Sequence, residues 1–593
     1  MSSSSSSSAP HPDSASHSNR HWNGWGFRDT EFILTSSGDI ALAGHRYAYS
    51  GRTMPHLRSW MEAKTGIDIK EASVSQREPA APKAVVNEPF MRGVSGNCHH
   101  VDTSDRDRIF HAHGHTAQEV YTLRFGMFAR VPDVVVYPST VEHVQSIMRL
   151  ASEHNVCVIP YGGGTTVTQS LLCPPDESRT IASLDMRLLS AVSHIDRTNM
   201  TARIQAGAIG KAIEATLNSA GLTLGHEPDS MEFSSMGGWV ATRASGMRKN
   251  RYGNIEDIVQ RIQMVRADGT LLDRPLAAPR VSTGPDLNHI MLGSEGTLGI
   301  VTEVTVRIAA RPDCTVYGSV IFPTFQHGVN ACRDIQRQHI TPTSFRLVDN
   351  NQFQFGQALK PTNDSVSMIA DFSSDMTERL KRWYVTRHLK FDVNSMVAAT
   401  VVFEGTKAEV AEQQRRVYAV CASYGGVKAG ADNGIRGYFL TYMIAYLRDF
   451  GFNYSFIAES FETSVPWSNI TTLCEQTKLT IYNAAKQLGV TKQPFVSCRV
   501  TQLYDTGVCV YFYFGFVWTG LTDPVHAFET IEQMARDTVI QCGGSLSHHH
   551  GIGKLRKNWM SQTVGESGMD VLKMMKMGLD PKNVLGSRNL IDV

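Results

Sequence analysis

Apolar and polar positions alternate most clearly in two parts of the chain. Between residues 130 and 168, the runs "DVVVYP" and "VCVIP" are typical of short buried strands. They flank "STVEHVQSIMRLASEHN", whose apolar spacing predicts an amphipathic helix capped by Ser139 or Thr140. This part of the chain therefore predicts a strand–helix–strand unit.

The second part is "VCVYFYFGFVW" at 508–518, which alternates with a period of two. A period of two places alternate side chains on opposite faces of a strand. One predicted face is wholly apolar: Val510, Phe512, Phe514 and Phe516. The other face carries two phenols and a thiol: Tyr511, Tyr513 and Cys509.

Three consecutive glycines, Gly162 to Gly164, follow the second strand of the first unit. The run lacks the position and spacing of a Rossmann fingerprint, and no G-K-[ST] follows it as in a Walker A loop. Backbone N–H groups without neighbouring Cβ atoms can wrap a phosphate. A phosphate-binding loop and a mobile turn both fit this run on its own.

Two further segments, 226–259 and 292–308, are also rich in Gly, Ser and Thr. Three such loops in one region favour a single extended ligand that the backbone contacts repeatedly.

Composition narrows the class of protein. The chain has 593 residues and a formal charge of +1, with 57 basic and 56 acidic residues. This length predicts about two to four domains, and the charge balance gives no reason to expect nucleic acid as a partner.

The ten cysteines contain no C-x-x-C pair, which argues against a zinc ribbon or a secreted disulfide framework. The first 20 residues lack the apolar core of a secretory signal, and 508–518 is too short to span a bilayer. We expect a soluble intracellular protein that can still rest on a membrane surface.

Longer motifs carry a resemblance. "PYGGGTTV", "SSMGGWVATRASG" and "GSEGTLGIVTE" resemble the FAD domain of the vanillyl-alcohol-oxidase-like, or PCMH-type, flavoproteins. "HEPDSMEFSSMGGWVATRASGMRKNRYGNIED", "FLTYMIAYLRDFG", "SFETSVPW" and "GGSLSHHHGIGKLRK" are similar to the alkyldihydroxyacetonephosphate synthase (alkylglycerone-phosphate synthase) family within that group. The resemblance runs from "HWNGWGF" at 21–27 to the C-terminus.

The resemblance implies an α+β fold: a two-subdomain FAD-binding domain and an α+β cap domain for the substrate, with an N-terminal, mainly helical region. The boundaries that we expect divide the chain into five parts: a disordered tail at 1–20, the helical region at 21–128, the FAD domain at 129–311, the cap at 312–545, and a C-terminal active-site segment at 546–593 that packs back on the FAD domain.

The family reaction replaces the acyl chain of acyl-dihydroxyacetone phosphate by a long-chain fatty alcohol and forms an ether lipid. FAD is implied as the cofactor, with a covalent adduct at its N5 and no net redox change. An FAD-dependent D-2-hydroxyacid dehydrogenase or oxidase of the same fold is the alternative, since it shares the FAD loops.

The matching motifs imply which residues contact FAD. They are Pro160, Tyr161, Gly162, Gly163, Gly164, Thr165 and Thr166; Asp229, Ser230, Met231, Glu232, Phe233, Ser234 and Ser235; Thr242, Arg243, Ala244 and Ser245; and Ser294, Glu295, Gly296, Thr297, Leu298, Gly299 and Ile300. Arg243 is expected to help balance the charge of the pyrophosphate.

Tyr511 aligns with the acid/base tyrosine of the family, whereas the residues alone favour a sheet tyrosine that merely packs. A phenol needs a cationic neighbour or the flavin to act near neutral pH, because its ordinary pKa is near 10.

Arg346 matches a position important for activity, and Arg448 matches a substrate-binding arginine. A guanidinium suits a phosphate, although Arg448 also fits an ordinary ion pair with Asp449. The C-terminal "GSRNLI" matches a further segment linked to activity, by contact with the site or by simple docking.

His548, His549 and His550 are consecutive and are flanked by glycines. In an extended segment His549 points away from the other two, and no cysteine or carboxylate lies at ligand spacing nearby, so we expect no metal site. The resemblance places the three residues in an active-site loop, where they hold phosphate or shuttle protons beside Tyr511.

The family also implies peroxisomal location, a homodimer, and peripheral contact with a membrane. The C-terminal "IDV" is not a peroxisomal signal of the S-K-L type, and the N-terminus carries no recognisable one.

Overall fold

The computed structural model describes residues 19–73, 75, 80–274, 278–361 and 384–593, so residues 1–18 of the predicted tail lie outside it. The described chain begins with a small three-stranded antiparallel sheet and a set of short helices. These elements are β1 (Phe32–Leu34), β2 (Ile40–Leu42), β3 (Thr53–Met54), α1 (Leu57–Thr65), α2 (Glu88–Ser95), β4 (His100–Asp102), α3 (Asp105–Phe110) and α4 (Ala117–Phe125).

The predicted strand–helix–strand unit is confirmed as β5 (Val134–Tyr137), α5 (Val141–Glu153) and β6 (Cys157–Tyr161). Thr140 caps α5, because its side chain accepts a hydrogen bond from the backbone N–H of His143. With β7 (Ile181–Asp185) these strands form a four-stranded sheet of order β4-β5-β7-β6, in which β5 and β6 run parallel to β7. The glycine run therefore leaves the end of a buried parallel strand.

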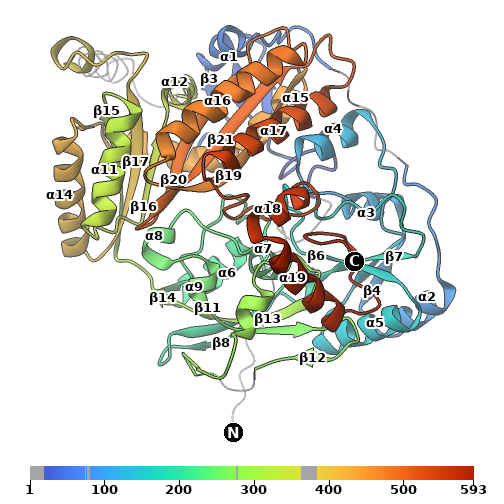
Figure 1. Cartoon of the computed structure of the whole chain (residues 1–593). Helices are drawn as coiled ribbons and strands as arrows, with labels where there is room; N and C mark the ends of the chain where they lie inside the picture. The colour runs from blue at the N-terminus through green and yellow to red at the C-terminus, as the bar shows by residue number, and fades with distance from the viewer. Residues whose placement is uncertain (1–18, 74, 76–79, 275–277, 362–383) are drawn as a thin grey trace.

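A second small sheet follows, and it is antiparallel with the order β12-β11-β13-β9-β8. Its apolar face forms a core of its own with the helices of the same region. The elements are β8 (Val192–Asp196), β9 (Thr201–Gln205), α6 (Gly210–Ser219), β10 (Leu222–Thr223), α7 (Met236–Thr242), α8 (Lys249–Tyr252), α9 (Ile255–Ile258), β11 (Val259–Val265), β12 (Leu271–Leu272), α10 (Leu287–Met291), β13 (Ile300–Arg307) and β14 (Ala309–Ala310). Both small sheets lie in the lower half of Figure 1.

The upper half of Figure 1 holds a seven-stranded antiparallel sheet of order β18-β15-β17-β16-β20-β21-β19. Apolar residues of α11, α14, α16 and α17 pack on one face of this sheet in the largest core of the described chain. The elements are β15 (Cys314–Phe322), α11 (Phe325–Arg337), β16 (Ser344–Val348), α12 (Asn350–Ala358), β17 (Val397–Gly405), α14 (Lys407–Ser423), β18 (Val427–Lys428), α15 (Ala431–Phe452), β19 (Phe456–Pro466), α16 (Ile470–Gln487), β20 (Phe495–Leu503), β21 (Gly507–Val517) and α17 (Pro524–Gln541).

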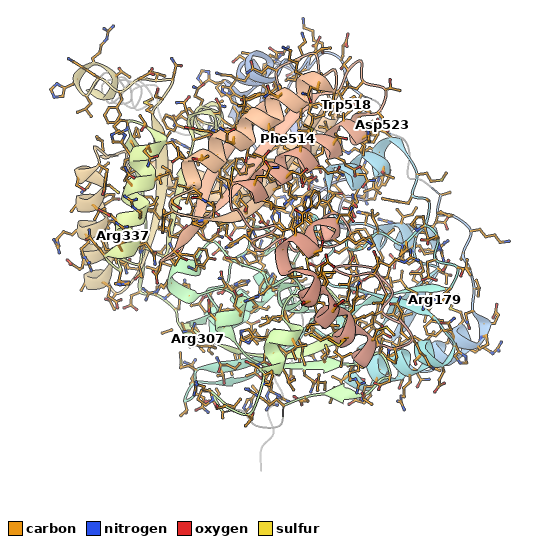
Figure 2. The ribbon with its side chains drawn as sticks, in the orientation of Figure 1. Arg179, Arg307, Arg337, Phe514, Trp518 and Asp523 are labelled. Carbon is orange, nitrogen blue, oxygen red and sulfur yellow. The ribbon has the colours of Figure 1, made fainter. Side chains whose placement is uncertain are left out.

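Strand β21 confirms the predicted alternation. Val510, Phe512, Phe514 and Phe516 belong to the large core, where the Phe514 ring stacks on Phe528 of α17 with centroids 4.4 Å apart. Figure 2 shows Phe514 and Trp518 in the upper part of the molecule, well away from Arg179 and Arg307 in the lower half. The opposite face of β21 is left for the phenols.

The chain ends with α18 (Met560–Val564), α19 (Glu566–Leu579) and an irregular segment. In Figure 1 helix α19 crosses in front of the lower half, and the C-terminus lies beside the small parallel sheet. The Val158 N–H donates to the Val584 carbonyl (2.7 Å), and the Lys576 ammonium donates to the Thr297 carbonyl (3.1 Å). Among the described helices, none is both long enough and apolar enough to cross a bilayer.

Candidate active site

A cavity of about 410 Å³ lies between the glycine-rich loops of the lower half and the free face of the large sheet. Most of the predicted cofactor residues line it: Pro160, Tyr161, Gly162, Gly163, Gly164, Thr165 and Thr166; Asp229, Ser230, Glu232, Phe233, Ser234 and Ser235; Thr242, Ala244 and Ser245; and Ser294, Glu295, Gly296, Gly299 and Ile300. Loops that are far apart in the sequence therefore meet around one ligand-sized space.

Four predicted cofactor residues are not among the lining residues. Met231 packs against the core of the second small sheet, and Leu298 is buried. Thr297 donates its hydroxyl to the Ser294 carbonyl (2.7 Å). Arg243 pairs with Glu256 (3.8 Å), and its expected role beside the pyrophosphate stays a prediction.

The glycine run forms a cradle that side chains would fill. A Cβ on Gly162 would lie 2.4 Å from the Ser235 hydroxyl, and one on Gly163 would lie 1.9 Å from the Phe233 carbonyl oxygen. Gly164 has a φ of +70°, a conformation that favours glycine. The buried Ser294 hydroxyl lines the same space and has no hydrogen-bond partner within the described part of the chain. A backbone cradle with a spare hydroxyl fits a large ligand that carries phosphate groups.

Arg20 supports this cradle from behind. Its Nη1 donates to the Gly163 carbonyl (2.9 Å), and its guanidinium lies over the rings of Phe110 (5.1 Å) and Phe233 (4.9 Å). The predicted tail includes this residue at its last position, and no local sequence signal distinguishes it there.

The large sheet supplies the opposite wall. Strand pairing sets Glu462, Tyr511 and Arg499 in one row, and Ser460, Tyr513 and Ser497 in the next. A third row holds Ala458, Gly515 and Phe495. The rows change from ionic to polar to apolar, and their members that line the cavity are Tyr511, Ser460, Tyr513, Ser497, Ala458 and Phe495.

Tyr511 lies at the ionic end of this wall and is 5% exposed. Its hydroxyl is 2.6 Å from His549 Nε2 and 3.0 Å from His550 Nε2. Burial raises the pKa of Tyr511 well above 10, and the nearby Asp229 adds to the rise, while Arg499 partly offsets it. Tyr511 thus holds its proton near neutral pH.

Arg499 is the cationic neighbour that a working phenol needs, and the sequence analysis missed it. Its guanidinium lies 4.8 Å from the centroid of the Tyr511 ring and pairs with Asp229 (3.3 Å). An arginine in the otherwise apolar strand "FVSCRV" was the available signal.

The three histidines do not alternate, and that expectation is wrong. Nδ1 of His548 and Nδ1 of His549 lie 2.7 Å apart, so neighbouring rings face each other. The cause is Glu462, a fully buried carboxylate that accepts the backbone N–H groups of His548 (2.6 Å), His549 (3.2 Å) and His550 (2.7 Å). Three consecutive N–H groups that point at one carboxylate force the segment to curl.

Burial lowers the pKa of all three imidazoles, to about 3 for His548, so they are neutral at pH 7. Burial acts to raise the pKa of Glu462, but the protonated forms of His550 and His549 and the Arg556 guanidinium lower it to well below its usual range. At pH 7, where the imidazoles are neutral, Arg556 and the three backbone N–H groups stabilise the carboxylate. The loop is therefore a set of neutral imidazoles around one fixed negative charge. His549 and His550 line the cavity, whereas His548 is not among its lining residues.

Strand β21 brings a cysteine to this loop, so the expectation of no nearby cysteine is also wrong. Ligand atoms of Cys509, His548 and His549 lie within 4.8 Å of one another, which is the spacing of a possible metal site. Both imidazole nitrogens of His548 are already hydrogen-bonded, to Tyr504 (2.6 Å) and to His549. That the protein works without a metal at this loop stays a prediction.

The two predicted arginines differ in position. Arg448 lines the cavity, pairs with Asp449 (2.9 Å) and donates to the His115 carbonyl (2.6 Å). The ion pair with Asp449 is therefore present, and the substrate-binding role stays a prediction. Arg346 is buried and donates to the Thr441 hydroxyl (2.8 Å), and it is not among the lining residues. Thr441 itself lines the cavity, so Arg346 lies one side chain away from it.

The C-terminal segment reaches the cavity as well as docking on the lower half. Ser587 and Asn589 line the cavity. The Asn589 amide donates to the carbonyls of Ser170 (3.1 Å) and Glu295 (3.3 Å), and Lys554 donates to its oxygen (2.9 Å).

The end of the cavity away from Tyr511 is apolar. Aromatic and aliphatic side chains of α1, α12, α15 and the sheet form it: Trp60, Met61, Phe355, Ile444, Leu447, Phe456 and Phe495. A ligand that fills the whole cavity therefore meets polar loops at one end and hydrocarbon at the other.

Comparison with known proteins identifies the family. The FAD binding domain family matches residues 132–274, and the C-terminal domain family of FAD linked oxidases matches residues 311–590. The chain is 45% identical over 574 residues to alkyldihydroxyacetonephosphate synthase of Caenorhabditis elegans, which covers 96% of this chain and 95% of that protein. The chain belongs to the alkyldihydroxyacetonephosphate synthase family.

Solved structures agree with this family and with its fold. A crystal structure of an alkyldihydroxyacetonephosphate synthase superimposes with a TM-score of 0.82 at 28% identity, and covers 98% of this chain and 99% of that one. The structure of p-cresol methylhydroxylase shares the fold with a TM-score of 0.63 at 16% identity, over 87% of this chain and 99% of that one. The fold is thus the α+β PCMH type, and the cofactor is FAD.

Proposed function

We propose that the protein is an alkyldihydroxyacetonephosphate synthase, which replaces the acyl chain of 1-acyl-dihydroxyacetone phosphate by a long-chain fatty alcohol. The observation that carries the proposal is the course of the cavity. It runs from the glycine cradle past Tyr511 and Arg448 to an apolar end. A substrate with a phosphate at one end and a fatty chain at the other matches that change of polarity.

Arg448 is the residue that we assign to the phosphate. Its guanidinium faces the cavity and is held in place by Asp449 and the His115 carbonyl. Its Nε and Nη2 donate to Asp449 and its Nη1 donates to the His115 carbonyl, so the remaining N–H groups of Nη1 and Nη2 are the donors that we assign to the phosphate. The fatty chain then extends towards Trp60, Phe355 and Phe495, where no buried polar partner is needed.

Tyr511 is the proton donor and acceptor in this proposal. FAD supplies the electron-accepting ring beside which the substrate carbon exchanges its oxygen substituent. Tyr511 gives its proton to the departing carboxylate, which leaves as the neutral acid, and takes a proton from the incoming alcohol. The raised pKa of Tyr511 favours its protonated, donating form before the reaction. His549 and His550 fix the direction of its hydroxyl.

The test is Tyr511→Phe, which keeps the ring and removes the hydroxyl. We expect bound FAD, measured by visible absorbance, to stay at the wild-type level and ether formation to fall by about 100-fold or more. Tyr252→Phe is the matched control, because Tyr252 is a buried phenol that bonds Glu404 (3.1 Å) and does not line the cavity. Ether formation at the control rate by Tyr511→Phe would remove Tyr511 from the reaction.

The same assay separates the proposal from a flavin oxidase. Ether formation from acyl-dihydroxyacetone phosphate and hexadecanol without an electron acceptor supports the exchange. Oxidation of a D-2-hydroxyacid that depends on an acceptor supports the alternative.

The location and assembly of the protein are further parts of the proposal. We infer peroxisomal location and a homodimer from the family resemblance, and peripheral membrane contact from the fatty substrates. Light scattering of the purified protein tests the dimer, and vesicle flotation tests the membrane contact.

A further inference from the structure

A second tyrosine lies on the far side of the histidine loop from the cavity. Tyr504 follows β20 and is half-buried, and it is not among the residues that line the cavity. Its hydroxyl lies 2.6 Å from His548 Nε2. Four contacts therefore connect five side chains in series: Tyr504 to His548 (2.6 Å), His548 to His549 (2.7 Å), His549 to Tyr511 (2.6 Å) and Tyr511 to His550 (3.0 Å).

The available donors and acceptors allow one donor-to-acceptor order along this series of hydrogen bonds. The Asn254 amide donates to the Tyr504 oxygen (3.3 Å), and the Ser245 hydroxyl donates to the Asn254 oxygen (2.7 Å), which fixes the orientation of that amide. The Tyr504 O–H is then left to donate to His548 Nε2. A neutral imidazole has one donor and one acceptor nitrogen.

The remaining hydrogens follow from that start. His548 donates from Nδ1 to His549 Nδ1, and His549 donates from Nε2 to the Tyr511 oxygen. The Tyr511 O–H donates to His550 Nε2. His548 and His549 are satisfied in their neutral forms, and every contact of the series carries one proton. The Nδ1–H of His550 has no hydrogen-bond partner within the described part of the chain and lies 3.7 Å from the Glu462 carboxylate.

We propose that Tyr504, His548 and His549 form a proton relay that moves the negative charge left on Tyr511 out of the cavity to Tyr504. The proposal rests on the proposed function, in which Tyr511 gives a proton to the departing carboxylate. Tyr504 and His548 are relay residues that act through Tyr511 and do not touch the substrate.

The transfers balance without any added reactant. With substrate bound, the Tyr511 O–H turns from His550 Nε2 to the leaving group. As Tyr511 loses this proton, His549 Nε2 gives its proton to the Tyr511 oxygen. His548 Nδ1 then gives a proton to His549 Nδ1, and the Tyr504 hydroxyl gives one to His548 Nε2. Both imidazoles end neutral as the other tautomer, and the phenolate is on Tyr504. When the alcohol gives its proton to Tyr511, each step reverses.

The difference in burial between Tyr511 and Tyr504 gives a physical reason for the relay. A phenolate on Tyr511 would be almost fully buried, since this side chain is 5% exposed. It would also compete with the nearby Asp229 carboxylate for Arg499, the ion-pair partner of Asp229. Tyr504 is half-buried, and the Lys249 ammonium lies 3.5 Å from the centroid of its ring. The Asn254 amide also donates to its oxygen, which favours the charged form. Burial raises the pKa of Tyr504 as well, while the hydrogen bond from Asn254 lowers it. Moving the charge therefore exchanges an almost fully buried site for a half-buried one with an amide donor at the oxygen and a cation at the ring.

The experiment uses Tyr504→Phe in the full-length FAD-loaded enzyme. The ring that packs against Lys249 and His548 is kept, and the relay loses its terminal hydroxyl. We expect the single-turnover rate of ether formation to fall about 10- to 100-fold, with FAD content and the KM of both substrates within about twofold of wild type. Tyr252→Phe, as the matched control, leaves all three unchanged.

A proton inventory distinguishes a relay from simple support of the loop. Rates measured across mixtures of H₂O and D₂O should depend on the deuterium fraction along a curve for wild type, because several protons move together. Tyr504→Phe should give a straight line and a smaller isotope effect. Lys249→Gln keeps every contact of the relay and serves as the second variant. We expect it to lose less of the rate than Tyr504→Phe and to keep a curved dependence of rate on the deuterium fraction.

The outcomes separate the relay from the proposed function. The relay alone would be overturned by the following pair of results. Tyr511→Phe loses the exchange reaction, while Tyr504→Phe keeps the rate of the control variant and a curved dependence on the deuterium fraction. Exchange that persists in Tyr511→Phe would overturn the assignment on which the relay rests. A Tyr504→Phe enzyme that loses FAD or shows a changed KM would indicate a structural role and contradict the relay.

Discussion

Arginine side chains around the cavity have separate roles that single positions in the sequence do not reveal. Arg499 pairs with Asp229 and lies over the Tyr511 ring, and Arg20 bonds the carbonyl of the glycine run. Arg448 faces the cavity while it is held by Asp449. Of these, Arg448 is the one placed to meet an anionic group of the substrate.

Replacement of Arg448 by Ala should therefore affect substrate binding most. A charge-assisted hydrogen bond is worth about 1.5–3 kcal/mol, so we expect the KM for acyl-dihydroxyacetone phosphate to rise about 10- to 100-fold. The KM for the alcohol should change little, since the alcohol carries no phosphate. Steady-state kinetics with each substrate varied in turn measures both values. Arg415→Ala is the control, because Arg415 is exposed and pairs with Glu412 on α14. An unchanged KM for the phosphate-bearing substrate would exclude this role.

Tyr511 shows how far residue-level prediction can reach. Its face of the strand follows from period-two alternation alone, and the apolar side was confirmed position by position. Its partners could not be predicted, because Arg499 and Glu462 come from neighbouring strands whose register is a property of the folded sheet. The sequence shows which side chains share a face and leaves open which ones meet across strands.

At the scale of elements, the histidine loop is shaped by a strand far from it in the sequence. Glu462 of β19 accepts three successive N–H groups and the Ser547 hydroxyl (2.7 Å). The prediction of an extended conformation for "SHHHG" is wrong for this reason. The backbone N–H groups of the loop donate to a buried carboxylate instead of to a neighbouring strand. The glycine loops were predictable because their own composition carries the signal.

The loop should make the stability of the protein depend on pH. Burial holds the pKa of His548 at about 3, while the unfolded residue takes up a proton near pH 6.5. Below pH 6.5 the unfolded chain binds more protons than the folded one, so stability falls as the pH falls. The contribution of this residue is about 1.4 kcal/mol for each pH unit below 6.5.

Thermal midpoints of the FAD-loaded enzyme between pH 7.5 and 5.5 measure the effect. The midpoint of wild type should fall more steeply with pH than that of His548→Asn. His99→Asn, at an exposed position, should keep the wild-type slope. Equal slopes for wild type and His548→Asn would show that the imidazole is free to protonate in the folded loop.

At the scale of the whole molecule, the cavity is shared by segments from nearly the full length of the chain. Loops of the lower half hold one side, the large sheet forms the other, and the C-terminal Ser587 and Asn589 complete it. The family resemblance predicted this α+β architecture, and the comparisons confirm it. The division of the chain at the predicted boundaries stays a prediction. Local patterns predict the strand–helix–strand unit and β21, whereas the closure of distant segments around one ligand depends on tertiary packing.

The central claim is that the cavity exchanges an acyloxy group for an alkoxy group with no net redox change. The most direct measurement uses the purified yellow protein with acyl-dihydroxyacetone phosphate and hexadecanol labelled with ¹⁸O, without any electron acceptor. We expect an ether product that retains the ¹⁸O, together with one unlabelled fatty acid for each ether formed. An ether without the label, or turnover that requires an electron acceptor, would contradict it.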